Sequence, residues 1–201
     1  MQYEIVKIKK EECKTSKWSG GETTELCIYP FDGNYKERDF KWRISTATVD
    51  VETSDFSKLP KISRVLMILK GQMKLFHENH HRVTLSEFEK DTFSGEWNTK
   101  SYGKAMDFNI MMNENCIGDL NHFIVNNTIH IESYPRNETY DYTMQGFYLP
   151  EGNVSISCNR ENIELESGEF VCIYYSHYED DLHIEISSKS AADVVGIHIE
   201  Y

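Results

Sequence analysis

The sequence predicts an all-β protein built from two jelly-roll modules, and three observations support that fold class. Apolar and polar residues alternate over many short segments, as they do in strands with one buried face. Turns rich in Gly, Asn and Asp, such as 31–34 (FDGN) and 151–153 (EGN), separate these segments. Finally, the segments 64–93 and 144–173 repeat one plan faintly: a strand, a glycine, a second strand, a leucine, a polar turn and a further strand.

The expected strands follow from the alternation, taken in chain order. The first four are 25–29 (ELCIY), 41–49 (KWRISTATV), 64–69 (RVLMIL) and 107–112 (DFNIMM). The later expected strands are 123–125, 128–134, 140–149, 154–158, 170–175, 182–187 and 194–200. One short helix is expected near 113–120. Many short strands with regular turns are typical of a sandwich or barrel.

Size and charge limit the possible partners. A chain of 201 residues is long enough for two small modules that share a core, with roughly 70% of the unfolded surface buried. The net charge of −12 argues against nucleic acid and against an anionic membrane as a partner. The five cysteines show no CxxC, no signal core opens the chain, and no apolar run approaches the ~20 residues of a membrane span. We therefore expect a cytoplasmic protein with reduced thiols.

Three pairs of polar residues give the most direct indication of function. Each pair is spaced two apart in a strand-like segment, so both members of a pair lie on one face. The pairs are Thr23/Glu25, Arg43/Ser45 and Asp107/Asn109. If the three segments line one barrel, these groups converge inside it. A convergent polar cluster in a mostly apolar cavity is typical of a small-molecule site.

Arg43 is the central residue of this hypothesis. An arginine between Trp42 and Ile44 in a strand cannot be buried alone without a large free-energy cost. It needs carboxylates, for which Glu25 and Asp107 are the natural candidates, or an anionic ligand. Arg43 can therefore brace the barrel in an ion-pair network or keep a donor free for a ligand carboxylate. An exposed arginine is the third alternative.

Five sequence blocks resemble a known family. They match, in order, the patterns W-x-G-G-x-T-x-E with I-Y-P, F-x-W-R-I-S, F-S-x-x-P with D-R-x-L, F-D-G, and D-F-N-x-M. In this chain the blocks are 18–25 with 28–30, 40–45, 56–60 with 64–66, 93–95, and 107–111. The chain thus resembles the HutD/Ves family over residues 18–112. Ser63 and Ser94 stand where the family patterns have Asp, so no role of those two acids carries over.

The resemblance implies a cupin-type, double-module β-barrel (a bicupin) and an association with the regulation of histidine utilisation or with stress response. Many cupins hold a metal through an HxH pair, and this chain has none. His77, His80 and His81 instead fall at an expected hairpin tip (FHENHHRV), where we expect exposed loop histidines. We expect no metal and no cofactor.

Together these observations predict a module at 1–113 that carries the motifs, and a second module at 114–201 packed on it as one compact unit. The predicted function is non-catalytic, regulatory binding of a small polar or anionic metabolite, such as a glutamate derivative from histidine utilisation. Its site residues are Thr23, Glu25, Arg43, Ser45, Asp107 and Asn109. The alternatives are a metal-free isomerase or hydrolase with Glu25 or Asp107 as general base, and a protein-interaction module with a filled barrel. A homodimer through exposed sheet edges is a further expectation.

Overall fold

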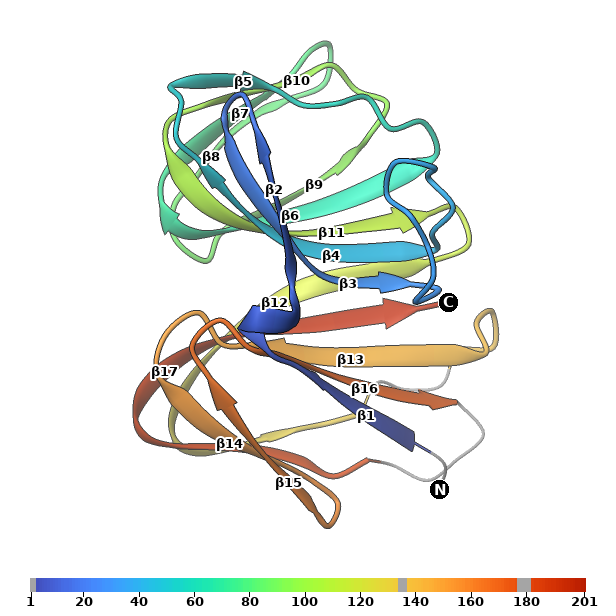
Figure 1. Cartoon of the computed structure of the whole chain (residues 1–201), viewed down its shortest axis with the longest axis vertical. Coiled ribbons are helices and arrows are strands. Elements are labelled where there is room, and N and C mark those ends of the chain that lie inside the picture. The colour runs from blue at the N-terminus through green and yellow to red at the C-terminus, as the bar shows by residue number, and fades with distance from the viewer. Residues whose placement is uncertain (1–2, 134–136, 177–181) are drawn as a thin grey trace. The chain divides into compact units, whose positions relative to one another are not determined.

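The computed structural model describes residues 3–133, 137–176 and 182–201. These residues form strands β1 to β17 and one 3₁₀ helix, η1 (Lys10–Glu12), as Figure 1 shows. The chain divides into two compact units. We call Cys13–Ile117 the motif unit, and Met1–Glu12 with Gly118–Tyr201 the terminal unit. Within the described part of the chain, no helix has the length and apolar character to cross a membrane.

The motif unit consists of two antiparallel sheets. The order of the larger sheet is β2 (Lys14–Trp18), β3 (Gly21–Tyr29), β4 (Trp42–Val49), β11 (Ala105–Asn113), β6 (Ile62–Gly71) and β9 (Lys90–Ser94). The order of the smaller sheet is β5 (Thr53–Asp55), β10 (Thr99–Tyr102), β7 (Met73–His77) and β8 (Arg82–Leu85). In Figure 1 these strands, drawn from blue to yellow-green, curve around one barrel.

The core of the motif unit is formed by apolar side chains from both sheets. Leu66 and Ile68 on β6 belong to the same buried cluster as Met73 and Leu75 on β7 and Leu85 on β8. Alternation explains this arrangement, because residues two apart on each strand point to the same interior face. Burying one such leucine side chain contributes about 2 kcal/mol to the free energy of unfolding.

The terminal unit has its own sheet and its own core. The sheet order is β1 (Tyr3–Ile8), β16 (Phe170–Ser176), β13 (Tyr142–Tyr148), β17 (Ile184–Glu200), β14 (Asn153–Cys158) and β15 (Glu161–Glu166), and β12 (Ile117–Ile131) pairs with β17. A large apolar cluster that includes Phe147, Ile156 and Leu165 fills this unit. The first strand of the chain pairs with β16, so residues before Cys13 belong with the C-terminal part.

The all-β prediction is confirmed, but several element assignments were wrong. The expected helix at 113–120 is a turn followed by the start of β12 at Ile117. The Asn113 side chain explains this, because its Oδ1 accepts a hydrogen bond from the Asn115 N–H at 2.9 Å. Such a local bond competes with the hydrogen bonds of a helix.

Two pairs of expected strands are each one long strand. The expected strands 123–125 and 128–134 both fall on β12, which ends at Ile131, and Tyr134 lies outside the described residues. The expected strands 182–187 and 194–200 are both part of β17, which begins at Ile184. Each pair is continuous in the structure, where β12 and β17 pair with each other.

Candidate functional site

The three predicted pairs lie on three neighbouring strands, β3, β4 and β11. Their register places the residues in two rows that run across the sheet, because directly opposite residues share a face. The rows are Thr23–Ala47–Asp107 and Glu25–Ser45–Asn109. The predicted convergence of the pairs therefore arises from strand register.

A third row brings in a second arginine. Arg43 on β4 lies opposite Met111 on β11, and Met111 lies opposite Arg64 on β6. Arg64 belongs to a family motif but was not among the predicted site residues. The sequence does contain a signal for this residue. Arg64 begins an otherwise apolar strand segment, and burying it without a partner costs free energy just as burying Arg43 does.

Apart from Glu25, the residues of these rows form the floor of a cavity of about 290 Å³, which we call the motif-unit cavity. Five of the predicted residues line it: Thr23, Arg43, Ser45, Asp107 and Asn109. Glu25 is not part of the lining, and it contacts Arg43 from the side. The other lining residues are Ser16, Trp18, Tyr35, Ala47, Val49, Ser54, Asp55, Phe56, Ser57, Arg64 and Met111. The cavity thus combines a polar floor with apolar and aromatic walls.

Arg43 is buried and held by its neighbours. Its Nε donates a hydrogen bond to Glu25 Oε2 at 2.7 Å, and its Nη1 donates to Ser45 Oγ at 3.3 Å. The guanidinium carbon lies 4.3 Å from the centre of the Tyr35 ring, a cation–π distance. Among the described residues no hydrogen bond joins Arg43 to Asp107, so of its two expected partners only Glu25 is one.

Arg64 is also buried but has a different environment. Its guanidinium carbon lies 4.7 Å from the centre of the Phe56 ring and 5.2 Å from that of Phe93. Its Nε is fully buried and has no hydrogen-bond partner among the described residues. Burial lowers the pKa of Arg64 to about 10, and the nearby charge of Asp107 opposes that effect. Arg64 therefore remains a cation at neutral pH, with a donor left unused.

Asp107 and Asn109 supply unused acceptors on the same floor. The Oδ1 atoms of both side chains are buried and lack a hydrogen-bond partner within the described parts of the chain. Burial raises the pKa of Asp107 to about 7, against the opposing charge of Arg64. Each unpaired buried polar group costs about 1–3 kcal/mol. A ligand that pairs with these atoms would recover that free energy.

The histidines at the β7–β8 turn differ in part from the expectation. His80 and His81 are exposed as predicted, but the prediction is wrong for His77, which is 1% exposed. His77 ends β7 and still belongs to the strand, so its side chain points into the barrel. There its Nε2 lies 2.8 Å from Asp91 Oδ2, and its Nδ1 lies 2.8 Å from Thr99 Oγ1.

Comparison with known proteins places the chain among relatives. A family model described as HutD matches residues 10–193. The chain belongs to the HutD family. Protein Ves from Cronobacter sakazakii is 32% identical over 113 residues, which are 54% of this chain and 59% of that protein. The chain therefore matches less than two thirds of the length of this curated relative.

Solved structures agree with the HutD assignment at the level of the fold. A conserved protein of unknown function from Pseudomonas aeruginosa PAO1 has a TM-score of 0.82 at 19% identity, covering 98% of this chain and 100% of that one. HutD from Pseudomonas fluorescens SBW25 has a TM-score of 0.68 at 18% identity, covering 96% and 98%. The predicted cupin-like, double-module fold and the HutD/Ves resemblance are thereby confirmed.

Proposed function

We propose that this HutD-family protein binds a small, carboxylate-bearing polar metabolite in the motif-unit cavity and does not transform it. One observation supports this most strongly: two buried arginines share the cavity with two unpaired acceptor atoms, on Asp107 and Asn109. Buried polar groups in a folded protein nearly always have partners, and a binding site is one setting in which a ligand supplies them.

The charges suggest how the ligand is oriented. Arg64 offers a buried N–H donor and a positive charge, so it would bind the carboxylate. Asp107 and Asn109 would accept hydrogen bonds from an amino or amide group of the same ligand. Thr23 and Ser45 would supply hydroxyl groups, while Glu25 keeps Arg43 in place.

The size of the cavity favours a ligand no larger than an amino acid derivative. Its volume of about 290 Å³ lies at the lower end of the range of ligand pockets. We propose histidine or a glutamate-type intermediate as the ligand, because molecules of this size suit the cavity and the family is associated with histidine utilisation. A regulatory role in the cytoplasm is part of the same proposal. The filled-barrel alternative has less support, because a filled barrel would leave no such cavity.

The test is calorimetric titration of the purified protein with histidine, glutamate and their pathway intermediates. Losing one charge-assisted hydrogen bond costs about 1.5–3 kcal/mol, so Arg64→Met should weaken binding by at least about tenfold. Arg43→Met should also weaken binding, because it removes the second positive charge from the cavity. Arg82→Met is the matched control, because Arg82 is exposed on β8 and stacks on Phe76 outside the cavity. Absence of binding by the wild type to the whole panel would contradict the ligand assignment.

Catalysis by a general base is the second candidate, and the Asp107 pKa is the observation that favours it. A carboxyl with a pKa of about 7 can exchange protons at neutral pH, and this one faces the cavity. If the protein is an enzyme, Asp107→Asn should abolish turnover of a bound metabolite while the fold and the binding remain. Chromatographic detection of product from each bound metabolite separates this candidate from simple binding.

A further inference from the structure

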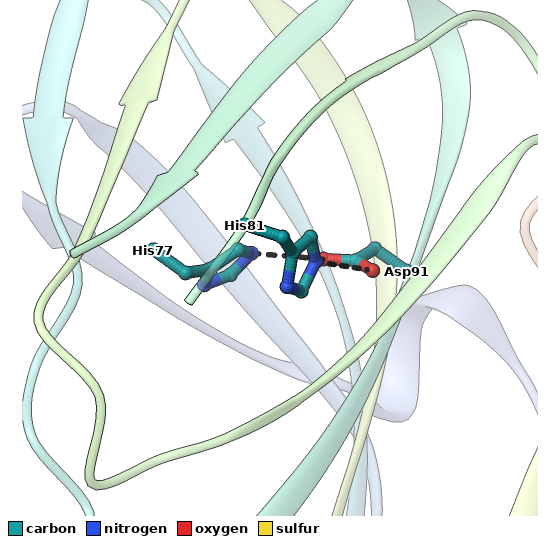
Figure 2. A group of neighbouring side chains, drawn as sticks. All are labelled: His77, His81 and Asp91. Atoms are coloured by element: carbon teal, nitrogen blue, oxygen red, sulfur yellow. Dashed lines mark hydrogen bonds and ion pairs between the residues drawn. The ribbon is translucent and has the colours of Figure 1, made fainter. Parts of the chain in front are cut away.

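Three potential metal ligands meet beside the β7–β8 turn. They are His77 at the end of β7, His81 just before β8, and Asp91 on β9. Figure 2 shows both imidazole rings directed at the Asp91 carboxylate. His81 Nε2 lies 3.0 Å from Asp91 Oδ1 and 3.1 Å from Oδ2. One ligand atom from each residue lies within 4.8 Å of the other two.

The backbone holds the two histidines in this arrangement. The His77 N–H donates to the His81 carbonyl at 2.9 Å, and the His80 N–H donates to the His77 carbonyl at 3.0 Å. Asn79 takes the left-handed conformation (φ 63°) that a tight turn requires. The turn therefore returns His81 over His77, with 4.5 Å between the ring centres. Asp91 comes from the other sheet, so the ligands do not depend on one flexible loop.

Thr99 fixes the orientation of the buried ring. The Thr99 hydroxyl lies 2.8 Å from His77 Nδ1, which leaves Nε2 directed at Asp91. Metal-binding histidines typically use their second nitrogen in this way, donating its proton to a nearby oxygen. The His81 side chain is 40% exposed, so an ion has a route from solvent to the group.

We propose that His77 Nε2, His81 Nε2 and the Asp91 carboxylate bind a divalent transition-metal ion of the zinc type. Two imidazoles and one carboxylate suit zinc better than calcium or magnesium, which prefer oxygen ligands. Bonds of about 2.0–2.1 Å place tetrahedral ligand atoms roughly 3.3 Å apart. The nitrogen–oxygen distances of 2.8 Å to His77 and 3.0 Å to His81 need to lengthen by only a few tenths of an ångström, which the exposed His81 permits. Water from the solvent side completes the coordination. The proposal departs from the expectation of no metal, and it combines the buried His77 with the exposed His81.

Zinc titration of the metal-stripped full chain, followed by calorimetry, tests the proposal. We expect one zinc ion per chain in the wild type. Removing one ligand, in His81→Ala or Asp91→Asn, should lower the zinc affinity at least about tenfold, the lower limit known for the outer partners of such ligands. His80→Ala is the matched control, because His80 is the adjacent exposed imidazole, stacks on Trp97 at 3.7 Å and lies outside the group. It should leave the affinity unchanged.

Cobalt(II) gives a second readout that does not depend on affinity. Its visible absorption should show a tetrahedral or five-coordinate ion in the wild type and in His80→Ala, and lose that spectrum in His81→Ala and Asp91→Asn. Near-ultraviolet circular dichroism checks that each variant is folded, and His81→Ala is the safer variant because His81 is exposed. The proposal is overturned if the wild type binds no zinc, if binding survives both ligand substitutions, or if His80→Ala weakens it equally.

Discussion

At the scale of single residues, Asp107 has the most unusual chemistry in the motif-unit cavity. Its carboxyl group is buried, and its pKa of about 7 lies well above that of a solvated aspartate. The folded protein therefore holds a proton that the unfolded chain releases near pH 4. Between these pH values, the unfolded state binds fewer protons than the folded state, so rising pH favours unfolding through this group.

This gives a prediction for pH-dependent stability. The contribution of Asp107 should be greatest below pH ~4 and fall by a few kcal/mol as the pH rises through about 7. In Asp107→Asn the contribution is absent, because the amide does not titrate. Urea unfolding of both proteins from pH 4 to pH 8 measures the effect as the difference between their free energies of unfolding. We expect the free energy of unfolding of the wild type minus that of Asp107→Asn to fall as the pH rises. A value that stays constant or rises with pH would contradict the buried, protonated carboxyl group.

The other residues of the site show what sequence reasoning can and cannot reach. The in-phase pairs could be read from spacing alone, because strand alternation fixes which residues share a face. The partner of Arg43 could not be chosen, since Glu25 and Asp107 are both carboxylates at suitable spacing, and only the register decides. The burial of His77 was also hidden, because polar neighbours in FHENHHRV suggested that the strand had already ended.

At the scale of elements, the close contact of β3 with β4 depends on Gly21 at the start of β3. A Cβ atom built on Gly21 would lie 1.8 Å from the Thr48 carbonyl oxygen on β4, a backbone atom that cannot move aside alone. Gly21 lies opposite Val49, in the row of residues next to the row that contains Thr23 and Asp107. A larger residue at Gly21 would therefore push β3 away from β4 and displace the strands that form the cavity floor.

We predict that Gly21→Ala lowers the free energy of unfolding by more than about 3 kcal/mol, because clash and backbone strain combine. Gly152→Ala is the control. Gly152 also has a positive φ, of 100°, but an added Cβ there meets nothing within 4 Å, so only strain of about 1–2 kcal/mol remains. Denaturant unfolding of both variants makes the comparison, and equal losses would show that the β3–β4 contact is not the cause.

The wrong helix prediction has an explanation at the same scale. Residues 113–120 lack clear alternation, and Asn113 is compatible with either a helix start or a turn. The hydrogen bond from the Asn115 N–H to Asn113 Oδ1 favours the turn. From Ile117 onward, the pairing of β12 with β17 keeps the backbone extended. Local sequence could not reveal a pairing partner that lies in β17.

At the scale of the whole molecule, the chain is an all-β member of the HutD family, and its fold class was predictable from alternation and motifs together. The assignment of the N-terminal strand was not predictable, because β1 pairs with β16, far away in sequence. Both proposed sites use residues of the motif unit only. The family motifs cover this same unit, which explains why sequence reasoning indicated function there.

The motif-unit cavity has a floor on central strands and a rim on short outer segments. The rim residues include Ser16 and Trp18 on the edge strand β2, and Ser54 and Phe56 in and just after β5. Ser16 and Trp18 are exposed, so replacing them removes little core packing. If the cavity binds a metabolite as proposed, rim substitutions will therefore change the fit of that ligand without disturbing the fold. Under the proposed function, the floor of this chain would keep its contact with the carboxylate while single rim substitutions changed the rest of the ligand that fits.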